Sequence, residues 1–297
     1  MPKITIADNS FIKLHIAVFL AGFTGVFGKL IHLDAFVLVW YRMLLVTFFL
    51  FFILLFSKKL QKISWKDFGK MALIGSIIAI HWVTFYGSIA HSNISIGVVC
   101  FSLCGFFSAL AEPLLLKKKF SLTNLLLSMI VIVGIGLIFS FDHRYRTGIL
   151  YGTVSAALAS VFTILNRKYS STCSSSNMLL YQMGTGFLLL TLLSPIYLRM
   201  NPEIAIIPGN MDFLFLSILA IVCTILPFMF QIQVLRHISA FTVNLTYTLE
   251  PIYSILIAFI FFGEAREVTF AFYVGLVIII VAVLLQNRNT FINSRSC

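Results

Sequence analysis

The chain has 297 residues, of which 60% are hydrophobic and only 10% are charged, and its mean hydropathy is +1.03. Soluble domains carry about 25% charged residues, so 21 Lys and Arg with 10 Asp and Glu are too few to cover a soluble surface. No stretch has a soluble composition, which also excludes a soluble domain on one anchor. The sequence therefore predicts an all-α protein that crosses a lipid bilayer many times.

Ten apolar runs follow one another between clusters of charged or turn-forming residues. A helix needs about 20 apolar residues to cross the hydrocarbon core of a bilayer. The predicted transmembrane helices are 11–31, 36–56, 67–89, 94–116, 122–141, 147–166, 178–198, 212–235, 239–262 and 267–286. The connections are short, so no extramembrane domain is expected. The first run lacks a small-residue cleavage site and is predicted to be a helix, not a signal peptide.

The distribution of Lys and Arg predicts how the chain is oriented. With the N-terminus inside, most of these residues fall in cytoplasmic loops, and both termini are cytoplasmic. The richest clusters are Lys58 to Lys70 and Lys117 to Lys119. This arrangement explains the formal charge of +11 without a nucleic-acid partner.

The chain also repeats itself. Asp67-Phe68 opens the third helix and Asp212-Phe213 opens the eighth, 145 residues later. Ile94-Ser95 after the third helix is echoed by Ile238-Ser239 after the eighth. These echoes indicate two halves of five helices each.

An odd number of helices per half fixes the symmetry. The second half, 147–297, must enter the membrane with the opposite polarity to the first half, 1–146. The prediction is therefore an inverted repeat, which is common among transporters of the alternating-access type.

Several local phrases resemble the EamA-type permeases of the drug/metabolite transporter superfamily. They are Trp40-Tyr41-Arg42, His81-Trp82-Val83-Thr84-Phe85-Tyr86 and Leu249-Glu250-Pro251-Ile252-Tyr253, with Phe262-Gly263-Glu264 closing the ninth helix. The resemblance covers nearly the whole chain. It implies ten helices around a central cavity that helices 1, 3, 4, 6, 8 and 9 line. It also implies export of small metabolites or amino acids across the inner membrane of a bacterium by rocking of the two halves.

The ninth predicted helix is polar at membrane depth. Charged groups in hydrocarbon need a partner or a water-filled cavity, and Pro251 leaves a backbone carbonyl open one turn back. Glu250 is predicted to be a substrate or proton site, with Asn244 and Tyr247 on neighbouring positions of the helix. The alternative is a structural hydrogen bond from Glu250 to another helix, and Pro251 has a gating or structural role.

Four first-half residues are candidates for contact with substrate, for proton binding or for gating. His81 titrates near neutral pH when exposed, and the resemblance places it with Trp82 and Tyr86 on a cavity-lining helix; the alternative is aromatic packing. Arg42 is expected to be gating or structural, pairing with Asp34 or Glu264 or extending towards the interface.

Two further positions complete the candidate set. Glu112 lies near Lys117 to Lys119 and is predicted to be a gate residue or simply a partner of these lysines. Pro227 lies four residues before Gln231 in the eighth helix, which favours a kink that turns Gln231 towards the cavity.

These features predict a transporter of small neutral or zwitterionic metabolites such as amino acids, because almost every Lys and Arg lies in a loop. Glu250 makes a proton-coupled antiporter the alternative mechanism. An intramembrane enzyme is not favoured: the six His residues offer no zinc-protease pair, and the Asp residues are isolated. No metal or cofactor is expected, and the sequence leaves open whether the protein is a monomer or a homodimer.

Overall fold

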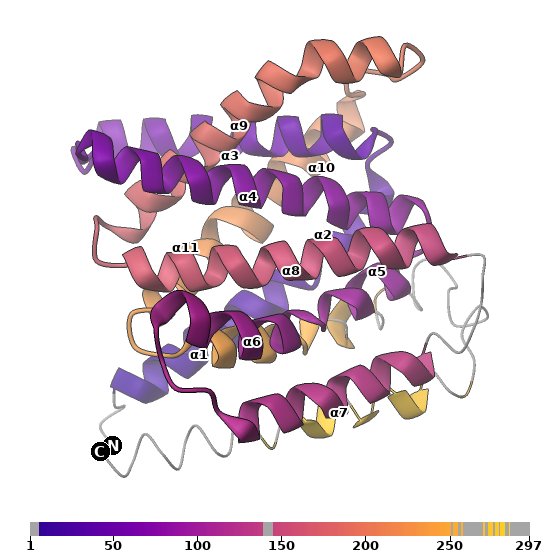
Figure 1. Cartoon of the computed structure of the whole chain (residues 1–297). Helices are drawn as coiled ribbons and strands as arrows, with labels where there is room; N and C mark the ends of the chain where they lie inside the picture. The colour runs from indigo at the N-terminus through magenta and orange to yellow at the C-terminus, as the bar shows by residue number, and fades with distance from the viewer. Residues whose placement is uncertain are drawn as a thin grey trace, which may run out of the picture.

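The structure is a computed structural model that describes residues 6–138 and 145–250, together with scattered positions between 252 and 285. The described residues contain helices and no strand. The helices form one bundle, and the axes of most of the long helices lie roughly along one line across the view (Figure 1). In chain order they are α1 (Ile6–Ala21), α2 (Thr24–Leu30), α3 (Ala35–Phe56), α4 (Trp65–Ala90), α5 (Ile94–Phe101), α6 (Cys104–Leu116), α7 (Leu122–Ile138), α8 (Arg146–Tyr169), α9 (Ser175–Met200), α10 (Asn210–Ala220), the π-helix η2 (Ile221–Ile225), α11 (Leu226–Val234) and α12 (Ala240–Tyr247).

Seven helical spans are long and apolar enough to cross a membrane. They are Asn9–Leu30, Ala35–Phe56, Trp65–Ala90, Ile94–Leu116, Arg146–Tyr169, Ser175–Met200 and Asn210–Val234. Each agrees with a predicted helix to within about three residues at either end. The chain is therefore a multi-pass membrane protein. α7 falls on the fifth predicted helix and α12 begins the ninth, whereas most of 267–286 lies outside the described residues.

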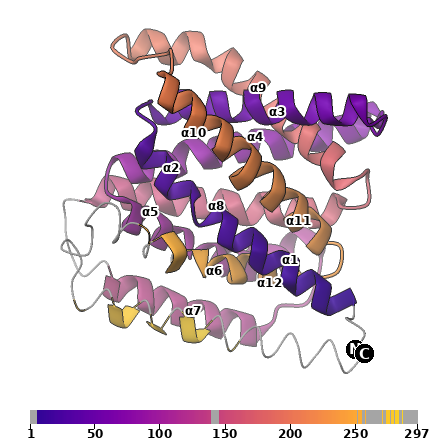
Figure 2. The ribbon, with the colours of Figure 1, turned by 180° about the vertical axis from the view of Figure 1, so that it is seen from behind.

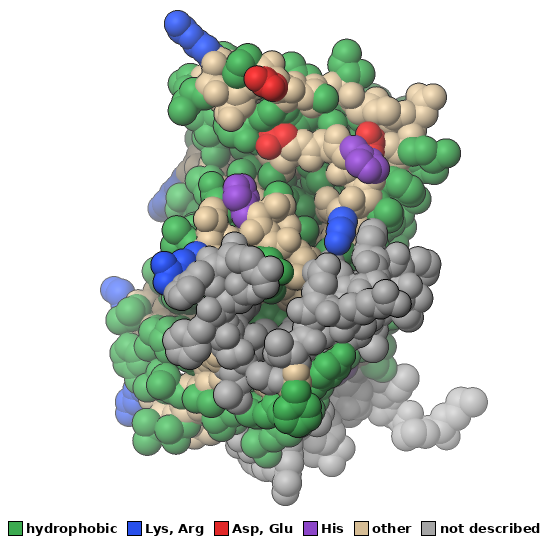
Figure 3. All heavy atoms as spheres, turned by 90° about the vertical axis from the view of Figure 1, so that its right-hand side faces the viewer, with side chains coloured by type: hydrophobic (Ala, Val, Ile, Leu, Met, Phe, Trp, Pro, Cys, Tyr) green, Lys and Arg blue, Asp and Glu red, His purple; other side chains and the backbone are tan. Residues whose placement is uncertain are grey.

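The ends of the helices alternate between two ends of the bundle. One end gathers the start of α1 and the loops 57–64, 117–121, 170–174 and 235–239, on the left of Figure 1. The opposite end faces the viewer in Figure 3, which shows Asp and Glu side chains on its upper part. The acids of this end include Asp34, Glu203 and Asp212. The predicted cytoplasmic loops thus share one end, and its orientation in the membrane stays a prediction.

The two halves of the chain are packed together along their length. α4 of the first half lies between α8 and α9 of the second half, and α1 packs on α11. Gly75 permits the closest approach, because a Cβ there would lie 2.1 Å from the backbone oxygen of Gln182. Small residues let membrane helices approach in this way.

Gly75→Ala is expected to destabilise the protein, because the new methyl group would meet backbone that cannot move aside. Overpacking of this kind costs about 1–3 kcal/mol. The matched control is Gly69→Ala in the same helix, where a Cβ meets nothing within 4 Å and better helix propensity favours Ala. Thermal unfolding in detergent should show a lower midpoint for Gly75→Ala only; equal midpoints for the two variants would contradict the expectation.

Four irregularities interrupt the membrane-crossing helices. Short turns interrupt the helices at Gly22–Phe23, Ser102–Leu103 and Thr248–Leu249. In the eighth span, one turn is the wider π-helix η2. Irregular backbone at membrane depth is tolerated where it lines a cavity or is buried in protein. All four irregularities adjoin residues that line the same cavity.

Candidate functional site

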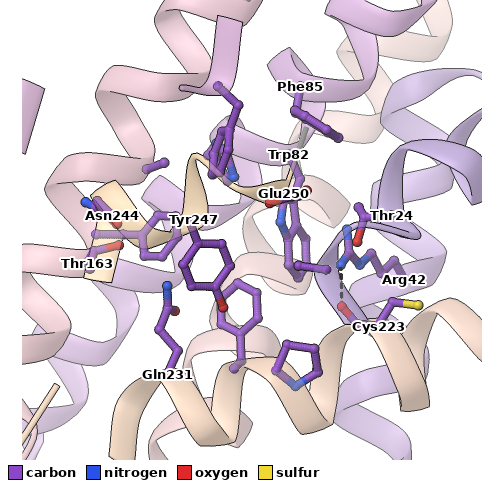
Figure 4. A pocket seen from close by; sticks show the side chains of 17 residues that line it. Thr24, Arg42, Trp82, Phe85, Thr163, Cys223, Gln231, Asn244, Tyr247 and Glu250 are labelled. Carbon is purple, nitrogen blue, oxygen red and sulfur yellow. Dashed lines mark hydrogen bonds between the residues drawn. The ribbon is translucent and has the colours of Figure 1, made fainter. Parts of the chain in front are cut away.

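A small cavity lies among the interrupted helices (Figure 4). It is lined by residues of the first, third, fourth, sixth, eighth and ninth predicted helices, together with Arg42 from α3. Its polar lining residues are Thr24, Arg42, His81, Thr163, Gln231, Asn244 and Glu250, and its aromatic ones are Trp82, Phe85, Phe101, Phe162, Phe228 and Tyr247. The space open to the centres of water molecules is about 50 Å³, which is room for a small number of waters.

Arg42 turns into the protein and is only 1% exposed. Its Nε donates to Thr224 Oγ1 at 2.8 Å, its Nη1 to the Tyr86 hydroxyl at 3.0 Å and its Nη2 to the Cys223 carbonyl at 3.3 Å. The guanidinium carbon lies 3.8 Å from the centroid of the Trp82 ring. The π-turn of η2 supplies two of these partners, and these bonds use three of the five guanidinium N–H donors.

This position of Arg42 differs from two of the arrangements considered from the sequence. Asp34 does not pair with it: the Asp34 carboxylate accepts from Phe36 N at 2.8 Å and from the Tyr197 hydroxyl at 3.0 Å, at the start of α3. The side chain also does not extend to the interface, because Thr224, Tyr86 and the Trp82 face satisfy it inside. Glu264 lies outside the described residues.

Glu250 follows the helix break at Thr248–Leu249 and lines the cavity. It is 5% exposed, and no hydrogen bond or ion pair joins its carboxylate to another side chain in the described part of the chain. Arg42 is the cation with which it interacts electrostatically; Figure 4 shows both side chains near Trp82. The structural hydrogen bond considered from the sequence is thus not seen within the described residues. Pro251 lies outside them.

His81 and Trp82 line the cavity, whereas Tyr86 does not. His81 Nδ1 lies 2.9 Å from the Ser155 carbonyl and 2.8 Å from the Ser155 hydroxyl, which attaches the imidazole to α8. Tyr86 lies one turn further along α4 and holds Arg42 through its hydroxyl. It therefore supports the wall of the cavity from behind.

The remaining candidates of the second half also lie at the cavity. Gln231, Asn244, Tyr247 and Pro227 all line it. Asn244 Nδ2 donates to Ser108 Oγ at 2.6 Å, which ties α12 to α6. The Gln231 Oε1 atom is buried without a hydrogen-bond partner among the described residues, and buried polar atoms of this kind call for a water or a ligand.

Glu112 lies away from the central cavity, at the end of the bundle that holds the predicted cytoplasmic loops. Its Oε1 accepts from Lys118 Nζ at 3.1 Å and lies 3.8 Å from Arg167 Nε, and its Oε2 accepts from Phe241 N at 2.7 Å. Arg167 donates in turn to the Leu235 and Ile238 carbonyls. The network joins α6 of the first half to α8 and the start of α12 in the second.

The resemblance placed the sixth predicted helix, which is α8, at the cavity, but no residue of α8 was among the predicted site residues. Ala159, Phe162 and Thr163 line the cavity, and the buried Thr163 hydroxyl has no hydrogen-bond partner in the part of the chain that the structure describes. Ser155, Ala159 and Thr163 follow one another every four residues, so they form one helix face. That spacing of small and polar residues was the available signal.

Comparisons with known proteins agree with this architecture. The family model described as the EamA-like transporter family matches residues 10–140 and again residues 146–288. An uncharacterized transporter of Bacillus subtilis strain 168, YxxF, is 26% identical over 191 residues, which are 62% of this chain and 61% of that protein. The chain thus matches less than two thirds of that relative's length. A solved crystal structure superposes with a TM-score of 0.71 at 13% identity, over 93% of this chain and 95% of that chain, which is a likeness of fold.

Proposed function

The chain belongs to the EamA-like transporter family, and from this premise we propose that it exports small zwitterionic or neutral metabolites, such as amino acids, from the cytoplasm. The proposed mechanism is alternating access: two five-helix halves rock around one central site. The proposed location is the bacterial inner membrane, with both termini in the cytoplasm. The observation that carries the substrate class is the central cavity, which places one carboxylate and one guanidinium among aromatic walls.

Corresponding features of the two halves support the inverted repeat of ten helices. The family model matches both 10–140 and 146–288. The break at Ser102–Leu103 recurs at Thr248–Leu249, and the helix cap Asn93 recurs at Ser239, each 146 residues later. On this spacing Asn93, not Ser95, corresponds to Ser239, so the pairing of Ile94-Ser95 with Ile238-Ser239 is displaced by two residues.

The cavity suits a substrate with both an ammonium and a carboxylate. Glu250 offers the ammonium a carboxylate with no direct partner in the described part of the chain, and Arg42 has N–H donors beyond the three that its protein contacts use. The aromatic side chains offer an apolar surface for the rest of the molecule. A substrate with net charge would leave one of the two protein charges uncompensated, which is costly in a buried site.

The test compares three molecules that share one apolar part. Leucine is a zwitterion, leucinamide a cation and 4-methylpentanoate an anion at neutral pH. The purified full chain is placed in liposomes and the uptake of each labelled compound is measured. We expect leucine to be carried at least about tenfold better than either analogue. Preference for a charged analogue, or uptake no faster than into empty liposomes for all amino acids tried, would contradict the proposal.

Proton-coupled antiport is the second candidate mechanism. The observation that favours it is the position of Glu250. This carboxylate lines the cavity and has no side-chain partner in the described residues. If a proton and the substrate alternate on this group, substrate movement must carry protons in the opposite direction. A pH-sensitive dye inside the liposomes reports that flux, whereas a facilitator would move the same substrate with no pH change.

The Glu112 network is proposed as the gate at the cytoplasmic end of the cavity. Glu112→Gln keeps the side-chain size but weakens the contacts with Lys118 and Arg167, so this end should open more readily. We expect a cysteine-free variant carrying a single cysteine at Ser108 to react with a thiol reagent at least about threefold faster when Glu112→Gln is added. The matched control is Glu203→Gln, an exposed residue of a loop at the opposite end. Equal labelling rates with and without Glu112→Gln would argue against the gate.

A further inference from the structure

A second, larger pocket lies at the end of the bundle where α1 begins and α9 begins. It has a volume of about 440 Å³ open to the centres of water molecules. Figure 2 shows the start of α1 and the end of α11 near each other on its right, with the turn into α9 above them. The pocket is separate from the central cavity, because Met229 and Gln233 line it while Phe228 and Gln231 of the same helix line the cavity.

Three basic side chains, one from α1 and two from the turn after α11, line this pocket. They are Lys13 of α1 and Arg236 and His237, which follow α11, and no Asp or Glu is among the described lining residues. Two of these side chains are held in place: Lys13 Nζ donates to Gln233 Oε1 at 2.8 Å, and Arg236 donates to the Ser170 and Cys173 carbonyls at 3.1 and 3.0 Å. The pocket is therefore a preformed, positively charged site.

The N-terminus of α9 contributes the opposite wall. Ser174, Ser175 and Ser176 line the pocket there, and the first N–H groups of a 26-residue helix carry partial positive charge. Ser174 is already used as the helix cap. Ser175 is only 6% exposed, and its hydroxyl has no hydrogen-bond partner in the described part of the chain. A hydroxyl that lines the pocket from a nearly buried residue, next to the first N–H groups of a helix, suits an oxyanion.

We propose that this pocket binds a phosphate group, either free or as the headgroup of an anionic lipid. Lys13 supplies a charge-assisted hydrogen bond, the Ser175 hydroxyl and the first N–H groups of α9 supply neutral ones, and Arg236 adds charge at the rim. These are the groups that hold phosphate in proteins. The site is independent of what the central cavity carries.

Thermal unfolding of the full chain in a neutral detergent tests the site. The unfolding midpoint is followed against sodium phosphate, with sodium chloride of equal ionic strength as the reference, and then against phosphatidylglycerol, with phosphatidylcholine as the reference. We expect a saturable rise of the midpoint with phosphate, phosphatidylglycerol or both. A rise with phosphate identifies free phosphate as a sufficient ligand, and a rise with phosphatidylglycerol alone identifies the lipid headgroup.

Two variants and one control assign the effect to this pocket. Lys13→Gln should raise the half-saturating ligand concentration about tenfold, and Ser175→Ala should raise it severalfold; Ser175→Ala keeps the test open if Lys13→Gln folds poorly. Lys66→Gln makes the same charge change at an exposed position at the start of α4 and should leave the wild-type value. The proposal is overturned if phosphate and phosphatidylglycerol match their references, or if Lys66→Gln weakens binding as much as Lys13→Gln.

Discussion

Glu250→Gln is expected to abolish recognition of the substrate's ammonium group while leaving the fold intact. Glutamine keeps the volume of the side chain and its ability to accept a hydrogen bond, but it removes the negative charge. Removing one partner of a buried charge pair costs about 2–5 kcal/mol, which is a loss of affinity of at least about thirtyfold. Uptake of leucine into liposomes measures this loss directly.

The same variant separates transport from stability. Glu250 has no direct side-chain partner in the described residues, and Arg42 keeps its three hydrogen bonds in the variant, so Glu250→Gln should unfold near the wild-type midpoint. Glu203→Gln, the same change in an exposed loop, should alter neither quantity. If Glu250→Gln carries leucine as the wild type does, Glu250 is not the ammonium site. If leucine uptake survives but the proton flux stops, Glu250 is the coupling group and the ammonium binds elsewhere.

The positions of the membrane spans could be predicted from sequence because the bilayer imposes them. About 20 apolar residues are needed for each crossing, and Lys and Arg cluster at the span ends, as at 58–70 and 117–119. The seven long spans accordingly begin and end near their predicted bounds. The interruptions were not predictable in the same way. Ser102 and Leu103 include neither Gly nor Pro, so the break there is set by packing around the cavity.

The candidate site was predictable where residues are unusual for a membrane and was missed where they are not. His81, Gln231, Asn244 and Glu250 are polar at membrane depth, and all four line the cavity. Ala159 and Thr163 are ordinary residues of a membrane helix, and their spacing along α8 is only a weak signal, so they were not named from the sequence. Tyr86 lies on the same helix as His81 but outside the set of cavity-lining residues, and its hydroxyl accepts a hydrogen bond from Arg42.

Arg42→Lys is expected to destabilise the protein strongly although the charge is kept. A guanidinium can bond Thr224, Tyr86 and the Cys223 carbonyl at once while it stacks on Trp82; an ammonium is a point charge that cannot reproduce this fork. Losing such a buried network costs about 3–5 kcal/mol. Thermal unfolding should show a lower midpoint for Arg42→Lys, and no change for Arg199→Lys at the exposed end of α9.

A second variant separates the contribution of Arg42 to stability from its proposed binding of the substrate carboxylate. Tyr86→Phe removes one acceptor of Arg42 and keeps the ring, so it should cost about 1.5–3 kcal/mol of stability, less than Arg42→Lys. It frees a guanidinium N–H next to the cavity and should leave leucine uptake intact. Should Arg42→Lys unfold like the wild type, the guanidinium would not be the link between α3, α4 and η2. If it is less stable but still prefers leucine over leucinamide by the wild-type ratio, Arg42 stabilises the cavity wall and the substrate carboxylate binds another group.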